Sequence, residues 1–174
     1  MVNSLVTAGG ITTTVIVTPV VSTTPAYTAG DSIGGKLTLT KIVDPRKSIN
    51  ATPSAVPTFF GSGIIQSIVL VDQAKQSLAV DILFFNSDPS ATTFTDNAVL
   101  DVADADLLKA IGHVSILAAD YTALNDNSLA TKTNLGIAFN TTGSTTLYAA
   151  IIARGTPTFA ATNDLQLMTT VLGD

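Results

Sequence analysis

The chain has 174 residues, of which 12% are charged, and eight Lys and Arg against 13 acidic residues give a net charge of −5. Soluble domains typically carry about 25% charged residues. The basic residues are scattered and form no stripe, so we expect no nucleic-acid partner. No apolar run approaches the ~20 residues needed to span a bilayer, so we expect no membrane partner.

The absence of cysteine excludes disulfides, thiolate metal ligands and cysteine nucleophiles. Residues 1–10 lack the charged and apolar regions of a signal peptide, and we expect the protein to be made in a cytoplasm. The length is that of one domain. We therefore predict a single domain over residues 1–174, with residues 1–10 as a flexible N-terminal arm.

The polarity of the chain resides in Thr, Ser, Asn and Asp, and every acidic residue is Asp. Long surface helices normally carry Glu and Lys, so this composition favours strands and loops. A surface with few charges is also suited to burial against another protein surface. We therefore predict a homo-oligomer, and a monomer kept soluble by hydroxyl and amide groups is the alternative.

Two segments rich in β-branched residues open the predicted fold. Residues 11–21 are β-branched almost throughout, but Pro19 cannot donate to a sheet, so this strand should lie at an edge. Residues 36–43 alternate between apolar and polar, as a half-buried strand does. Residues 44–62 then form an extended, Pro-containing loop, and loops of this length are commonly functional. With the arm 1–10, this loop is where we expect contact with a partner.

The two most apolar segments are residues 64–72 and 78–86, which the polar residues 73–76 separate. The second segment alternates with a period of two, and both of its faces are largely apolar. Two strands joined by a short polar loop predict an antiparallel hairpin. Because both faces are apolar, we expect this hairpin to be central in its sheet and covered on both sides.

Residues 101–111 carry the signals of a short helix. Asp101 or Asp104 can cap its start, and Lys109 lies near its end. Gly112 follows as a C-cap. We therefore predict one helix over this range, the one convincing helix of the chain.

The rest of the chain is predicted to consist of strands and turns. We expect a polar loop over residues 119–134 and strands over 113–118, 135–139, 145–154 and 165–172. Together the segments give about eight antiparallel strands and one short helix. Their number and spacing predict an all-β fold, a β-sandwich or jelly roll.

His113 is the sole histidine and would have to be the base of any Ser–His–Asp triad. No serine lies in a G-x-S-x-G nucleophile elbow, since Ser62 is flanked as Phe60-Gly61-Ser62-Gly63-Ile64. A single histidine at the start of a strand is more often structural. We therefore predict no catalytic residue and no enzyme activity.

The acidic residues Asp96, Asp101, Asp104 and Asp106 are close in sequence, and Ca²⁺ prefers carboxylate ligands. Their spacing lacks the Gly and the closing Glu of an EF-hand loop. The alternative, which we favour, is that these acids complement the N-terminus of a helix. No pair of Asp residues is singled out for glycosidase chemistry, and we predict no bound metal and no cofactor.

Two glycine-rich stretches, residues 9–10 and 61–63, do not match phosphate-binding loops. Neither leads into a helix, and no Lys-Ser/Thr follows. The glycosylation sequons at Asn50 and Asn140 are expected to be chance matches in the absence of an export signal.

The tyrosines Tyr27, Tyr121 and Tyr148 are too scattered in sequence to define a platform for stacking on a sugar. A β-sandwich can still bind a glycan through its loops. Carbohydrate or receptor binding therefore stays as the alternative function.

Several segments of the chain carry a family resemblance. They are Tyr27–Gly35 (YTAGDSIGG), Gly63–Asp72 (GIIQSIVLVD), Thr92–Ala98 (TTFTDNA) with Asp104–Leu107 (DADL), and Leu147-Tyr148 leading to Arg154–Thr158 (RGTPT). Together they resemble a group of small tailed-bacteriophage virion proteins over most of the chain. The shared motifs are turns and strand patterns, and they include no binding residue.

The resemblance implies a β-sandwich or jelly-roll protein that decorates or cements a capsid, often as a small symmetric oligomer. On this basis we predict a structural virion protein that is assembled in the host cytoplasm. Its expected partners are the major capsid protein and further copies of itself, in a dimer or trimer. A virion component needs no cofactor and benefits from the lack of oxidisable thiols, which agrees with the composition.

Overall fold

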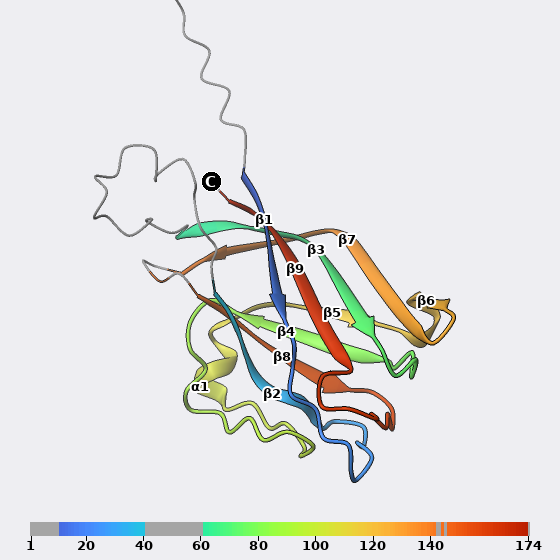
Figure 1. The fold of residues 1–174 in the computed structure, drawn as a ribbon. Coiled ribbons are helices and arrows are strands. Elements are labelled where there is room, and N and C mark those ends of the chain that lie inside the picture. The colour runs from blue at the N-terminus through green and yellow to red at the C-terminus, as the bar shows by residue number, and fades with distance from the viewer. Residues whose placement is uncertain (1–10, 41–60, 142–143, 145, 174) are drawn as a thin grey trace, which may run out of the picture.

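The computed structural model describes residues 11–40, 61–141, 144 and 146–173. In this part of the chain two antiparallel sheets lie face to face (Figure 1). The five-stranded sheet has the order β1-β9-β3-β7-β6, and the four-stranded sheet has the order β2-β8-β4-β5. The strands are β1 (Ile11–Val17), β2 (Ser32–Leu39), β3 (Ser62–Asp72), β4 (Val80–Phe85), β5 (Ala110–Ile116), β6 (Tyr121–Leu124), β7 (Asn127–Asn140), β8 (Leu147–Ala153) and β9 (Leu165–Gly173), and the helical turns are α1 (Asp104–Leu107) and the 3-10 helix η1 (Ala118–Asp120).

The strand pairs are nested along the chain. β1 pairs with β9, β2 with β8, β3 with β7 and β4 with β5. Successive strands therefore cross between the sheets as far as the β4–β5 pair, and the chain then returns alongside its own first half. β6 adds a short hairpin to β7. This is jelly-roll topology, so the predicted all-β sandwich is confirmed.

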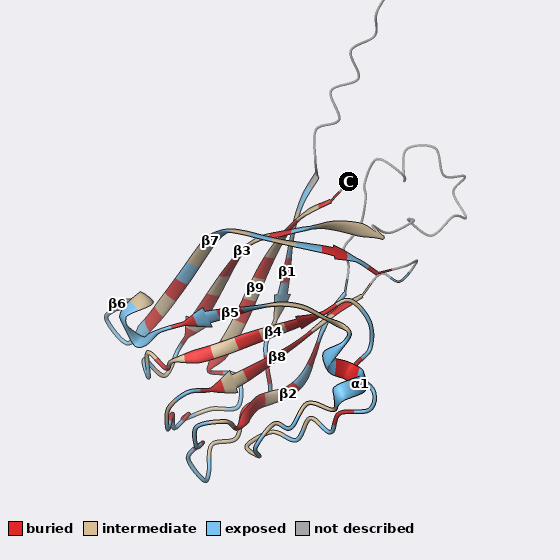
Figure 2. Cartoon of the chain, turned by 180° about the vertical axis from the view of Figure 1, so that it is seen from behind, coloured by how far each residue is buried: buried red, intermediate tan, exposed pale blue. Residues whose placement is uncertain are grey.

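The core lies between the sheets, where alternate residues of each strand point inward. Figure 2 shows the buried residues concentrated on the strands of both sheets. Each buried aliphatic or aromatic side chain contributes about 1.5–3 kcal/mol, so this layer is the main source of stability. Its fully buried members include Tyr27, Ile33, Leu39, Ile65, Ile68, Leu70, Ile82, Phe84 and Ile116.

The strands predicted at 11–21, 145–154 and 165–172 are found as β1, β8 and β9. β1 ends at Val17, before Pro19, and lies at the edge of the five-stranded sheet as the proline predicts. A segment that cannot supply a full set of ladder donors is tolerated best at an edge.

The strand predicted at residue 36 begins earlier, at Ser32, because the chain passes through a glycine bulge. Gly34 and Gly35 have φ angles of 73° and 68°. The register of the β2–β8 pair shifts between Ile33 and Lys36, on either side of these glycines. Positive φ costs glycine little, so β2 continues on both sides of this irregularity.

The prediction that residues 64–72 and 78–86 form a hairpin is wrong, because β3 and β4 lie in opposite sheets. Both strands are central, as predicted: β3 lies between β9 and β7, and β4 lies between β8 and β5. The connection crosses between the sheets with Lys75 and Ser77 at positive φ. A short polar loop suits such a crossing as well as a hairpin, and the apolar alternation of the strands does not distinguish the two.

The helix predicted over residues 101–111 is wrong in extent, since α1 has four residues. From Ala110 onward the chain pairs with β4 instead. Val114 and Ile116 are buried at the strand period of two, and Gly112, predicted as a C-cap, lies within β5. A helix of about three turns is marginal by itself, so strand pairing overrides the local signal.

The prediction of a polar loop over residues 119–134 is also wrong, because this range contains the end of η1, all of β6 and the first half of β7. Asn125 and Asp126 form the two-residue turn between these strands. The inward residues of β7 include Ala130, and its outward residues include Thr131 and Thr133. A strand with small inward side chains and polar outward ones lacks the apolar alternation on which a sequence-based assignment depends.

Gly34 offers a test of the bulge in β2. A Cβ atom at Gly34 would lie 2.3 Å from the Cβ of Pro19, at a φ that strains any L side chain. We predict that Gly34→Ala lowers the free energy of unfolding by at least ~2 kcal/mol. Gly136→Ala, at φ 63° with no atom within 4 Å, should cost about 1 kcal/mol from strain alone.

Urea denaturation followed by circular dichroism measures both losses. Gly155→Ala is the matched control, since its added Cβ meets nothing within 4 Å, and it should change the unfolding free energy by less than ~0.5 kcal/mol. Equal losses for Gly34→Ala and Gly136→Ala would contradict the role of the Pro19 contact.

Candidate functional site

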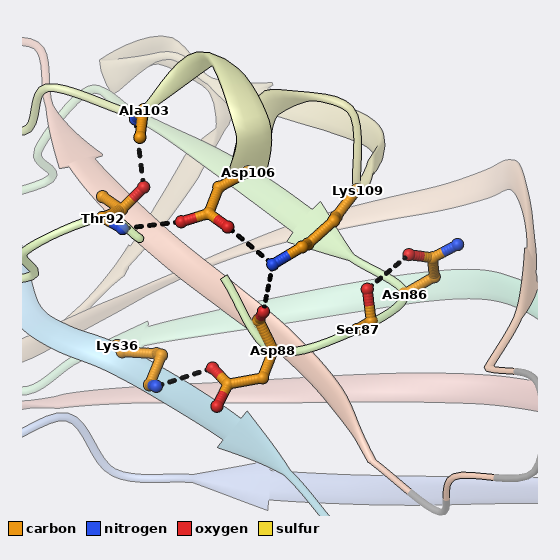
Figure 3. Close-up of polar contacts among 8 residues, drawn as sticks. All are labelled: Lys36, Asn86, Ser87, Asp88, Thr92, Ala103, Asp106 and Lys109. Atoms are coloured by element: carbon orange, nitrogen blue, oxygen red, sulfur yellow. Dashed lines mark hydrogen bonds and ion pairs between the residues drawn. The ribbon is translucent and has the colours of Figure 1, made fainter. Parts of the chain in front are cut away.

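A buried carboxylate fixes the connection between β4 and β5 to the four-stranded sheet (Figure 3). Asp106 of α1 is fully buried and accepts the Thr92 backbone N–H at 2.6 Å and the Lys109 ammonium at 2.7 Å. Lys109 also donates to the Asp88 carbonyl oxygen at 2.7 Å. Lys36 of β2 pairs with the Asp88 carboxylate at 2.7 Å. These contacts tie a long connection to strand β2.

The charge of Asp106 is balanced inside this network. Burial acts to raise its pKa, because it penalises the charged form. The hydrogen bonds from Lys109 and Thr92 outweigh that effect and hold the pKa of Asp106 below its usual range. Asp106 is therefore an anion that holds the fold together.

The structure separates the acids that are close in sequence. Asp104 and Asp106 lie in the first turn of α1, as the favoured interpretation predicts, but the N-cap residue Ala103 makes no side-chain hydrogen bond. Asp96 lies in the preceding loop with different partners. Within the described ranges, no group of three or more His, Asp or other ligand residues could hold a metal ion.

Asp96 joins the loops at one end of the sandwich. Its Oδ1 accepts the Tyr27 hydroxyl at 2.7 Å and the Gly34 N–H at 2.6 Å, and its Oδ2 accepts the Ser22 hydroxyl at 2.5 Å. Tyr27 is fully buried, and its ring packs nearly perpendicular to the Phe159 ring. Burial and the bond to Asp96 raise the pKa of Tyr27. Two of the motifs that carry the family resemblance, around Tyr27 and Asp96, thus meet here and fix the loops.

The other residues singled out in the sequence lie apart. His113 is exposed on β5 opposite Leu83, whereas Ser62 begins β3 in the other sheet. Tyr121 of β6 and Tyr148 of β8 belong to different sheets. The structure therefore brings together neither the histidine with this serine nor the tyrosines with one another.

Most of the predicted contact segments lie outside the described residues. This holds for residues 1–10 and for residues 44–60, which include Asn50. Asn140 is exposed at the end of β7. Among the helical segments that the structure describes, none has the length and apolar character to cross a membrane.

The outer face of the five-stranded sheet has no charged residue at its described positions, and we term it the uncharged face. The pairing registers bring apolar, hydroxyl and amide side chains to it from all five strands. None of these side chains is buried, so no described segment covers the face. It consists of Thr12, Thr14 and Ile16 (β1), Gln166, Met168, Thr170 and Leu172 (β9), Ile64, Ser67, Val69 and Val71 (β3), Leu129, Thr131, Thr133 and Ala138 (β7), and Thr122 and Leu124 (β6).

The outer face of the four-stranded sheet is both charged and partly covered. Asp81 of β4 pairs with Arg154 at 2.7 Å and accepts the Ser115 hydroxyl at 2.5 Å. The Phe94 ring of the β4–β5 connection lies edge-on to Phe85 at 6.3 Å, and Phe85 is fully buried. The described residues thus partly cover one outer sheet face and leave the other open, which makes the uncharged face the candidate functional surface.

This surface was not predicted from the sequence, although β3 carries a signal of it. Residues 64–72 are apolar on both faces, and we expected both faces to be covered. In the structure Ile68 and Leu70 point into the core, whereas Val69 and Val71 remain half-exposed. The apolar residues of this central strand therefore lie on both of its faces, and the described residues cover only the inner one.

A second buried carboxylate lies where β3 ends. Asp72 is fully buried, and its Oδ2 accepts the Ser77 N–H at 2.7 Å. Its Oδ1 and the Tyr121 hydroxyl are both buried without a partner among the described residues. Burial raises the pKa of Asp72, against the opposing effect of hydrogen bonds from Ser77 and neighbouring groups. Burial and the nearby negative charge of Asp72 raise the pKa of Tyr121.

Comparisons with known proteins add little to this geometry. No protein-family model matches the chain, and no curated protein matches it. Among solved structures, it is similar to a chain of the Israeli acute paralysis virus full particle heated to 63 degrees, with a TM-score of 0.29 and 12% identity. That match covers 94% of this chain and 68% of the virus chain. A likeness this distant supports no conclusion about function.

Asp72 gives a prediction about the pH dependence of stability. We predict that Asp72→Asn is more stable than the wild type at neutral pH. The folded-state pKa is raised above the reference value of 3.8, so the stability contributed by protonated Asp72 is complete below that value and is lost as pH rises through the folded pKa. Asparagine stays neutral and avoids this loss.

Guanidinium denaturation between about pH 4 and pH 7 tests the prediction, since the advantage of the variant should grow across that range. Asp126→Asn, at an exposed turn residue, controls for the removal of one negative charge. An advantage of Asp72→Asn that does not change with pH would contradict the assignment.

Proposed function

We propose that the protein is a structural virion protein of a tailed bacteriophage, a head decoration or cement protein that binds and stabilises the capsid surface. The observation that carries the proposal is the open, uncharged face of the five-stranded sheet. Jelly rolls occur in viral capsid proteins and in lectins, so the fold agrees with this function but does not select it. The resemblance of the loop and strand motifs to small phage virion proteins supports the same choice.

The chemistry of the uncharged face suits a protein partner. Ile16, Val69 and Met168 lie in one row across β1, β9 and β3, and threonine hydroxyls surround them. Burying this surface removes no ion from water, and desolvation of ions is the costly part of many interfaces. The hydroxyl groups can supply hydrogen bonds at the rim of a contact.

Stabilisation of the capsid would follow from the thermodynamic linkage between binding of this protein and assembly of the shell. A protein that binds the assembled shell and not free subunits shifts the equilibrium toward the shell. The proposed partners are the major capsid protein and further copies of this chain, as a dimer or trimer, in a virion assembled in the host cytoplasm. The proposal includes no reaction, metal or cofactor.

The double variant Thr131→Lys, Met168→Lys tests the role of the uncharged face. It places two charges on the open side of the sheet, and neither side chain belongs to the core. We predict at least about a tenfold loss of affinity for capsids of the phage whose genome encodes the chain, because an unpaired charge would be buried. Cosedimentation measures the loss, and thermal unfolding confirms that the domain stays folded.

His113→Lys is the matched control, since it adds a charge at an exposed position on the opposite outer face. It should bind capsids like the wild type. Wild-type binding by the double variant, or equal losses in both proteins, would argue against the uncharged face as the contact surface.

A hollow beside Asp96 supports the alternative function, a carbohydrate- or receptor-binding module of a fibre or tail. It has a volume of about 660 Å³, and its lining includes Ser22, Lys36, Phe94 and Asp96. Hydroxyl, ammonium and carboxylate groups beside one aromatic ring can recognise a sugar. A glycan screen with a reproducible ligand that Phe94→Ala no longer binds would favour this function, and an empty screen with intact capsid binding would favour decoration.

A further inference from the structure

The free edge of β1 has no feature that would prevent pairing with another strand. β1 pairs with β9 on one side, and no described strand pairs with it on the other. Its seven residues, ITTTVIV, are all β-branched and uncharged. An edge strand of this composition presents unpaired N–H and C=O groups to an incoming strand. A groove of about 310 Å³ opens beside it, lined by Thr14, Val15, Ile16, Thr38 and Thr40.

The other three edges of the described sheets are protected. β6 has four residues and follows Asp120, which forms an ion pair with Lys132. β2 carries Lys36 and the glycine bulge. β5 has a register shift against β4 and carries the exposed His113. Short strands, charges and bulges are the devices that keep sheet edges from pairing, and β1 has none of them.

We propose that β1 pairs antiparallel with β1 of a second copy of this chain about a two-fold axis. The two five-stranded sheets would then form one continuous sheet of ten strands. This inference rests on the homo-oligomer of the proposed function and specifies its contact, which depends on β1 and on no capsid. In the register that uses the whole strand, the cross-strand pairs are Ile11 with Val17, Thr12 with Ile16, Thr13 with Val15, and Thr14 with its own symmetry mate.

The charge distribution favours a second copy as the occupant of this edge. With a net charge of −5, two copies repel each other over most of their surfaces. Along β1 no charges meet, and β-branched residues face β-branched residues, which are favourable cross-strand pairs. An antiparallel pair also keeps the two outer faces on the same side. Dimerisation would therefore double the uncharged face without burying it.

Thr14→Cys tests the geometry, because the chain contains no other cysteine. Cα atoms directly opposite in an antiparallel pair lie about 4.5–5.5 Å apart, within the range that a disulfide spans. Under mild oxidation this variant should form a disulfide-linked dimer in high yield at micromolar concentration. Thr122→Cys, exposed on β6 at the other edge of the same sheet, should remain largely monomeric on a non-reducing gel.

Charged substitutions at Thr14 test the stability of the proposed dimer. Thr14→Lys should raise the dimer dissociation constant at least about tenfold in sedimentation equilibrium, because two lysines would face each other. Thr14→Asp should do the same. An equimolar mixture of the two variants should restore the dimer, since opposite charges then meet. Thr122→Lys should dimerise like the wild type.

A wild-type chain that stays monomeric at several hundred micromolar would overturn the inference. So would dimers that Thr14→Lys leaves intact and that Thr131→Lys, Met168→Lys disrupts, because the contact would then lie on the uncharged face. These measurements use the purified chain alone. A failure of capsid binding therefore leaves the β1 pairing standing. A monomeric chain leaves binding to the major capsid protein standing and contradicts only the proposed dimer or trimer.

Discussion

The burial of two inner sheet faces against each other is the constraint on which this structure depends. In nearly every strand alternate residues point into the core, and the residues between them form the two outer faces. The two outer faces differ in how far other described segments cover them. The connection between β4 and β5, fixed by the buried Asp106, brings Phe94 over the four-stranded sheet. The five-stranded sheet receives no such cover from the described residues, so its outer face remains open among them.

The parts of the fold that depend on local pattern could be predicted from the sequence. Alternation over residues 145–154 and 165–172 identifies β8 and β9, and Pro19 places the first strand at an edge. The scarcity of charge and the absence of Glu predict an all-β protein. These predictions succeed because the side-chain period of two and the missing N–H of proline are properties of the strand itself, whichever strand it pairs with.

The parts that depend on distant pairing could not be predicted. Nothing within residues 64–86 shows that β3 and β4 enter different sheets, since their partners lie up to about a hundred residues away. The local signals for a helix near Asp106 are overridden by the pairing of β5 with β4. The uncharged face contains residues of five strands, and only the pairing register of those strands places them on one surface. Its one local sign, the half-exposed apolar side of β3, was interpreted as contact within the chain.

The nesting of the strand pairs has a consequence for the order of folding. Ile11 lies opposite Gly173, so β1 can complete its pairing only after Gly173 has been synthesised. Folds built from such distant contacts form slowly, because loop closure precedes the gain from pairing. Until β9 arrives, both edges of a β-branched, uncharged strand are open to other chains. The yield of correctly folded protein therefore depends on how β1 is kept from premature association during synthesis.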